Sequence, residues 1–217
     1  FQTGGLTMTN TTNSKNTSNF FRKPRKGNAR APHSNKSKLT GFQNPWKVPK
    51  DLPAEKDQKK VLFLSKRGMT RSPVAREVMR SLVERSEWFG KIEVISAGVT
   101  KAYDNCPIDQ RMKEFCKGFG YSLQARSSFA GPQILSTADV IITLDHESEE
   151  FVRLQQHSIS GETYPLGVFM NTGSSPYVRD PYDRGEDLDV DECYEEILSS
   201  IEYGCAKLNA NLPNSLS

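Results

Sequence analysis

A polar loop joins an apolar run to a helical pattern between residues 61 and 73, and no other stretch constrains the fold as much. Leu62 to Leu64 are typical of a short buried strand. Ser72 is a good N-cap, and Pro73 suits the first turn of a helix. Apolar side chains then recur at helical spacing: Val74, Ala75, Val78, Met79, Leu82 and Val83. A strand, a Gly-containing loop and a helix N-terminus predict a phosphate cradle, because loop N–H groups and the helix dipole both favour an anion.

The loop resembles that of the low-molecular-weight protein tyrosine phosphatases, a family related to the thioredoxin-coupled arsenate reductases. In that family a buried strand is followed by Val-Cys-x-Gly-Asn-x-Cys-Arg-Ser-Pro. On this pattern Ser65 takes the place of the nucleophilic cysteine and Arg71 that of the phosphate-clamping arginine, and Ser72-Pro73 match as they stand. The resemblance implies that phosphate would be bound by the whole loop: Ser65, Lys66, Arg67, Gly68, Met69, Thr70, Arg71 and Ser72.

The sequence departs from this pattern at further positions of the loop. Arg67-Gly68 stands where the family has Gly-Asn, and Thr70 stands in place of the second cysteine. Gly68 suits the left-handed backbone that the family's asparagine adopts. Arg67 leaves two alternatives open: its side chain clashes with the loop, or it occupies the cradle.

Later segments alternate between strand and helix. Residues 92–98 and 139–144 have the apolar character of buried parallel strands, and residues 164–167 fit a short last strand. A helix opening at Pro107 and a closing helix over residues 193–208 are also predicted. The expected fold is an α/β three-layer sandwich. It has a four-stranded parallel sheet in flavodoxin-like order, with the phosphate loop after the first strand.

Candidate site residues converge on one edge of this sheet. In parallel α/β sheets the ligand site lies beyond the carboxyl ends of the strands. Ser65, Gly98, Asp145 and the loop after Gly167 all fall there. Ser96-Ala97-Gly98 and Asp145 also match motifs of the resembling family, which adds support for the fold.

A second motif, Arg179-Asp180-Pro181-Tyr182, follows the loop by about 110 residues, as in the family. The resemblance implies that Asp180 donates a proton to the leaving group and that Tyr182 lines the slot for a tyrosyl ring. Tyr103 is a candidate for the other wall of that slot. Taken alone, Asp-Pro-Tyr is only a turn signal.

The residue at position 65 decides the chemistry that we expect. A cradle of N–H groups can bring a thiol to its reactive thiolate at neutral pH, but an alcohol needs an adjacent base. No histidine lies near Ser65 in the sequence. Binding of phosphate or a phosphotyrosine-bearing ligand is therefore expected without efficient turnover, as in a pseudophosphatase. The alternatives are a phosphatase of low activity and a structural protein that acts through its N-terminal arm.

Residues 1–50 form a basic arm with ten Lys or Arg and no Asp or Glu, whereas the remaining chain carries 19 basic and 26 acidic side chains. The arm has no helical or strand periodicity, and it predicts disorder. Its composition, together with Phe1 at the start, resembles a plastid transit segment. The alternatives for the arm are a segment that contacts a protein partner, with nucleic acid the less expected ligand, and a merely solvated tail. The alternative location is the cytoplasm. The expected boundaries are the arm, a linker over 51–58, the phosphatase-like domain over 59–210 and a tail over 211–217.

Cysteine and histidine usage predicts neither a metal site nor a disulfide framework. The four cysteines are widely spaced, without a Cys-x-x-Cys pair, and the three histidines are scattered. No cofactor is expected. The longest apolar run is well below the roughly 18 residues of a membrane span.

Overall fold

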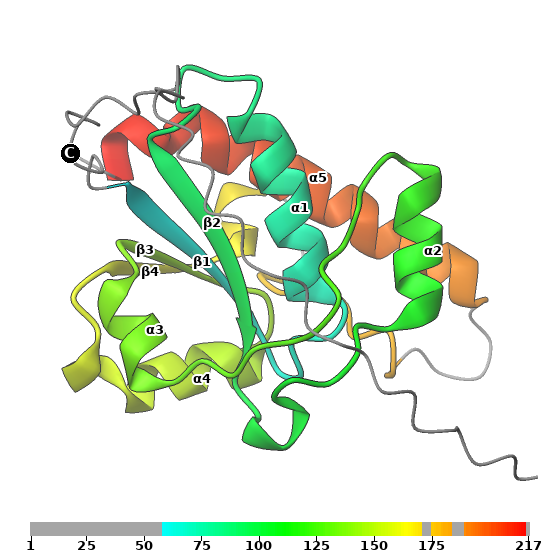
Figure 1. Ribbon diagram of the computed structural model, residues 1–217, viewed down its shortest axis with the longest axis horizontal. Helices are drawn as coiled ribbons and strands as arrows, with labels where there is room; N and C mark the ends of the chain where they lie inside the picture. The colour runs from blue at the N-terminus through cyan, green and yellow to red at the C-terminus, as the bar shows by residue number, and fades with distance from the viewer. Residues whose placement is uncertain (1–57, 171–174, 184–188, 216–217) are drawn as a thin grey trace, which may run out of the picture. The chain divides into compact units, whose positions relative to one another are not determined.

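Four parallel strands form the sheet of the computed structural model, which describes residues 58–170, 175–183 and 189–215. The strands are β1 (Lys59–Ser65), β2 (Ile92–Gly98), β3 (Val140–Thr143) and β4 (Glu162–Pro165), in the order β2-β1-β3-β4 (Figure 1). The central strand β1 pairs in parallel with β2 and with β3. Leu64 of β1 lies opposite Ala97 of β2 and Thr143 of β3. The predicted four-stranded flavodoxin-like order is confirmed.

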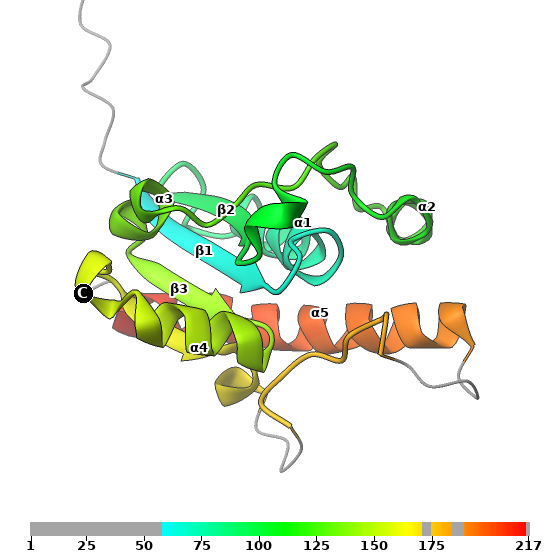
Figure 2. The same cartoon turned by 90° about the horizontal axis from the view of Figure 1, so that it is seen from below.

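Helices cover both faces of the sheet, which gives three layers (Figure 2). On one face lie α1 (Arg71–Val83) and the long α5 (Val190–Ser215), which pack on each other. On the other lie α3 (Pro132–Thr137) and α4 (His146–Leu154). The remaining α2 (Gln110–Gly118) packs against α5. None of the described helices has the length and apolar character that a bilayer crossing requires.

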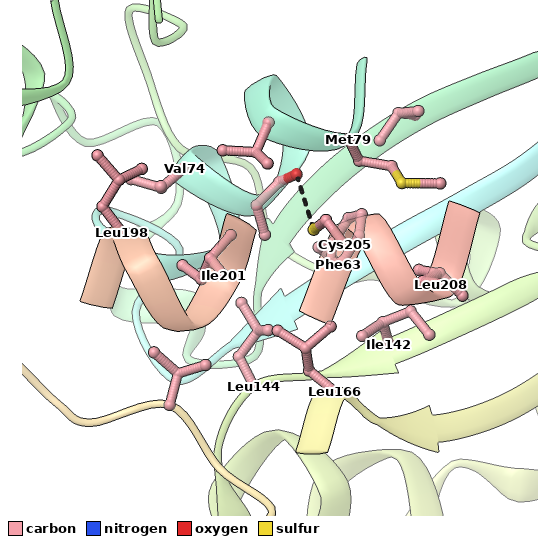
Figure 3. Close-up of a cluster of buried hydrophobic side chains, with 14 of the residues drawn as sticks. Phe63, Val74, Met79, Ile142, Leu144, Leu166, Leu198, Ile201, Cys205 and Leu208 are labelled. Carbon is pink, nitrogen blue, oxygen red and sulfur yellow. Dashed lines mark hydrogen bonds between the residues drawn. The ribbon is translucent and has the colours of Figure 1, made fainter. Parts of the chain in front are cut away.

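The central strand β1 is apolar on both sides because both of its faces are covered. Two clusters of buried apolar side chains lie on the two faces of the sheet. Val61 and Phe63 belong to the larger cluster, under α1 and α5, and Leu62 and Leu64 belong to the smaller one, under α3 and α4; all four are fully buried. Figure 3 shows Phe63 in the larger cluster, close to Cys205 of α5, whose thiol contacts the carbonyl oxygen of Ala75 at 3.8 Å. Burial raises the pKa of the Cys205 thiol, so it behaves as an apolar core residue.

Two predicted helix starts are corrected. Thr70, and not Ser72, is the N-cap of α1, because the Ser72 hydroxyl donates to Ala97 O at 3.1 Å instead of capping. Helix α2 begins at Gln110 rather than at Pro107, because the Asp109 side chain accepts from Met112 N and caps it.

Other boundaries also differ from the sequence-based expectations. The last strand ends at Pro165, and residues Leu166–Phe169 form a 3-10 turn. Helix α3 was not predicted, because six residues are too few to show a helical period. The basic arm and nearly all of the linker lie outside the described residues, so the domain boundaries stay predictions.

The loop after β1 packs backbone to backbone against the end of β2. Gly68 has a φ of +71°, and a Cβ on it would lie 2.6 Å from Gly98 N. A Cβ on Gly98 would in turn lie 2.5 Å from Arg67 O. Contacts of that length are not available to a side chain, so two glycines let the loop and the strand touch.

We therefore predict that Gly98→Ala destabilises the protein by about 2–3 kcal/mol, because backbone atoms cannot move aside as a flexible side chain can. Gly118→Ala is the matched control, since a Cβ there meets nothing within 4 Å. Urea unfolding of both variants measures the difference. Equal stability of the two would contradict the close approach.

Candidate active site

Two backbone carbonyls of the loop between β1 and α1 accept hydrogen bonds from neighbouring segments. Lys66 O accepts from Thr100 N at 3.0 Å, and Met69 O accepts from Asp109 N at 3.1 Å. The N–H groups of residues 67–70, by contrast, make no hydrogen bond to any described part of the chain. A loop held by its carbonyls with its N–H groups left over has the properties of an anion cradle.

Arg71 is buried beneath this loop, with 3% of its surface exposed. Its Nη2 lies 2.8 Å from Asp145 Oδ2 and 3.0 Å from Asp180 Oδ2, and its Nη1 donates to Val178 O at 3.1 Å. Its Nε is buried and has no partner. A buried guanidinium with one unused donor is costly unless a further acceptor arrives.

Asp145 connects three elements of the site. One carboxylate oxygen accepts from Lys66 N at 2.8 Å and pairs with Arg71, while the other accepts from Ser148 N at 2.8 Å and caps α4. Sequence reasoning placed Asp145 at the sheet edge but missed this role. The signal was there, because an aspartate that ends a parallel strand and precedes a helix sits at the ligand edge.

Asp180 is brought to the loop as predicted, although it lies 109 residues after Arg71. Besides Arg71, it is 3.5 Å from Nη1 of Arg67, and its Oδ1 accepts from Tyr182 N at 3.0 Å. In this arrangement Asp180 is a counter-ion of two arginines.

Ser65 lies at the base of the loop and is 2% exposed. Its hydroxyl donates to the Ser72 hydroxyl at 2.9 Å, which itself donates to Ala97 O. His146, which follows β3 at the ligand edge, contacts the Tyr177 hydroxyl at 3.4 Å. The Ser65 proton is thus held by another alcohol and not by a base.

Two further predicted phosphate ligands are Lys66, whose side chain pairs with Glu147, and Thr70, which is buried. Lys66 Nζ forms a 2.5 Å ion pair with Glu147, which raises the pKa of Lys66 and lowers that of Glu147. Both side chains are partly exposed, so the pair contributes little stability. Thr70 is buried at the start of α1, and Met69 contributes its backbone.

Tyr103 and Tyr182, the two predicted walls of the slot, both lie close to Arg67 of the loop. The Arg67 guanidinium carbon is 4.6 Å from the ring centre of Tyr182 and 5.8 Å from that of Tyr103. Each such contact contributes on the order of 0.5–1 kcal/mol at a partly exposed site. Of the two alternatives for Arg67, the structure shows neither a clash nor entry into the cradle, because the side chain extends to the tyrosines.

The Tyr182 wall is anchored to the loop through one aspartate. The Tyr182 hydroxyl donates to Asp109 Oδ2 at 2.7 Å, while Asp109 N donates to Met69 O. Burial, and then the hydrogen bond to Asp109, raise the pKa of Tyr182. In the described residues, no three side chains of His, Cys, Asp or Glu gather as metal ligands.

Sequence comparisons relate this chain to one family. Residues 60–217 match the family model described as low molecular weight phosphotyrosine protein phosphatase. YfkJ of Bacillus subtilis, a low molecular weight protein-tyrosine-phosphatase, is 27% identical over 158 residues, which is 70% of this chain and 94% of that protein. Low molecular weight phosphotyrosine protein phosphatase 2 of Drosophila melanogaster is 26% identical over 149 residues, 67% of this chain and 87% of that protein.

Solved structures agree with the fold. The crystal structure of YfkJ superposes with a TM-score of 0.64 at 25% identity, covering 74% of this chain and 98% of that one. A protein tyrosine phosphatase from Entamoeba histolytica, crystallised with Hepes in its active site, gives a TM-score of 0.65 at 21% identity. That match covers 74% of this chain and 100% of the other.

The carboxylates around Arg71 give a prediction about stability. Asp145→Ala should cost on the order of 3 kcal/mol, because it removes a buried ion pair and the cap of α4 together. Asp180→Ala should cost only about 1 kcal/mol, because Asp180 is partly exposed and Arg71 keeps Asp145. Urea unfolding of the two variants compares them, and a larger loss for Asp180→Ala would contradict this ranking.

Proposed function

This chain belongs to the low molecular weight phosphotyrosine protein phosphatase family, and from that premise we propose that it binds phosphate but hydrolyses phosphate esters very poorly. In this proposal Ser65 stands at the nucleophile position, and the loop of residues 65–72 recognises the phosphate group. Asp180 and Tyr182 are the remnants of the family's leaving-group apparatus.

One observation carries the binding half of the proposal, namely the unpaired Nε of Arg71. It is a buried donor beside a loop whose N–H groups at 67–70 are also unpaired among the described residues. A phosphate oxygen would satisfy these donors, and charge-assisted bonds to a guanidinium are among the stronger hydrogen bonds in proteins.

The chemistry of the Ser65 hydroxyl supports the other half. A phosphoryl group would have to move to the Ser65 oxygen, and the hydroxyl proton would have to leave to a base. The group that holds Ser65 is the Ser72 hydroxyl, which is already a donor to Ala97 O. Losing the nucleophile from such a coupled apparatus costs on the order of a millionfold in turnover.

A phosphatase of low activity is the second candidate, because the anion cradle would still stabilise a transferring phosphoryl group. The role of the basic arm and plastid targeting stay predictions, since residues 1–57 lie outside the described part of the chain.

For turnover, we predict that wild type and Ser65→Ala hydrolyse para-nitrophenyl phosphate and acetyl phosphate at the same background rate. If Ser65 takes no part in the reaction, replacing it with alanine leaves the rate of hydrolysis unchanged. Ser65→Cys with acetyl phosphate is the positive control, because a thiolate in the same cradle is a competent nucleophile and this substrate carries no aromatic ring. Wild-type turnover well above Ser65→Ala, or a phosphoserine at position 65 in the mass spectrum, would establish the second candidate instead.

For binding, we predict that Arg71→Lys weakens inorganic phosphate at least about tenfold, because lysine keeps the charge but lacks the forked donors. Isothermal titration calorimetry measures the affinity, and urea unfolding verifies that the variant is folded. Arg153→Lys, on the exposed side of α4, is the matched control and should bind as wild type. Equal affinity of Arg71→Lys and wild type would contradict the assigned clamp.

A further inference from the structure

Arg67 occupies the space between the loop and the two tyrosines that flank it. Only 27% of its side chain is exposed, which is low for an arginine in a surface loop. Its guanidinium lies over the ring of Tyr182, over that of Tyr103 and within 3.5 Å of both Asp180 oxygens. Three partners therefore hold one planar group in one place.

The segments that carry the two tyrosines are also anchored by contacts that do not involve Arg67. Tyr182 is anchored by its hydroxyl to Asp109, and Asp109 is anchored to the loop through Met69 O. On the other side, Tyr103 N and O are engaged by Thr100 O and by the Ser127 hydroxyl. Removing the Arg67 side chain would consequently open space beside the Tyr182 ring, which stays tied to Asp109.

A planar guanidinium between aromatic rings takes the place that the ring of an aryl phosphate would need. For a phenyl ring to lie there, Arg67 would have to give up both ring contacts and Asp180 at once. Inorganic phosphate, or phosphate on a slender aliphatic carbon, needs no space between the rings, so Arg67 can keep its contacts with Tyr103, Tyr182 and Asp180. It also gains a cation nearby.

We propose that Arg67 sets the ligand class of this site: by filling the slot between Tyr103 and Tyr182, it restricts the cradle to phosphate groups that carry no aromatic ring. The inference rests on the proposed phosphate binding and adds which phosphates are accepted. Arg67 acts as a specificity-determining residue through the space it fills, with its charge as a secondary contribution to phosphate affinity.

Calorimetric titrations with inorganic phosphate and with phenyl phosphate test this on the full chain. The wild type should bind inorganic phosphate at least about tenfold more tightly than phenyl phosphate, because only the second ligand must displace Arg67. Arg67→Ala opens the slot and should shift the affinity ratio of the two ligands toward phenyl phosphate by about tenfold or more. Arg67→Met is the matched control, because it removes the charge but still fills the slot, so its ratio should stay close to that of wild type.

The outcomes separate this inference from the proposed function. If wild type binds neither ligand, phosphate binding itself is wrong and the inference falls with it. If wild type binds both ligands equally, or if Arg67→Ala leaves the ratio unchanged, phosphate binding stands and the role of Arg67 is wrong. An equal shift in Arg67→Ala and Arg67→Met would show that charge, and not occupancy of the slot, governs selection.

Discussion

The buried guanidinium of Arg71 is the group on which the architecture of the site depends. It sits at the carboxyl edge of the sheet and pairs with a carboxylate from the end of β3 and another from the segment after Val178. An unpaired charge in that position would be strongly destabilising, so these segments are drawn together around it. In this arrangement Nε of Arg71 and the N–H groups of residues 67–70 have no hydrogen-bond acceptor among the described residues.

Binding and catalysis draw on different atoms of this site, which explains how one can persist without the other. Recognition of an anion uses backbone N–H groups and a guanidinium, and both are set by the course of the chain and by Arg71. Bond breaking requires one reactive side chain and a proton acceptor for it. Ser65 offers a hydroxyl held by a second hydroxyl. The charges of the edge are balanced internally, by Asp145 and Asp180 around the arginines and by Glu147 beside Lys66.

The sequence predicted the sheet and its ligand edge because buried parallel strands and a strand–loop–helix motif are local patterns. It located Ser65, Arg71 and Asp180 by resemblance, and the structure brings them to one edge. It failed where distant residues compete for the same atom. Ser72 looks like a cap until Ala97 O takes its hydroxyl, and the pairing of Asp145 with Arg71 spans 74 residues that no local pattern connects. The place of Arg67 depended on where two tyrosines from separate loops come to lie.

The contact of Gly68 with Gly98 divides the loop into a part that can vary and a part that cannot. The backbones of the loop and of β2 touch because neither Gly68 nor Gly98 has a side chain. This contact fixes the path of the loop, whatever side chains the neighbouring residues have. The side chains at positions 65 and 67 can then be substituted while the course of the backbone around the anion stays the same. Substitutions in such a loop can change the chemistry done on a ligand, and which ligand is bound, without changing the backbone that surrounds it.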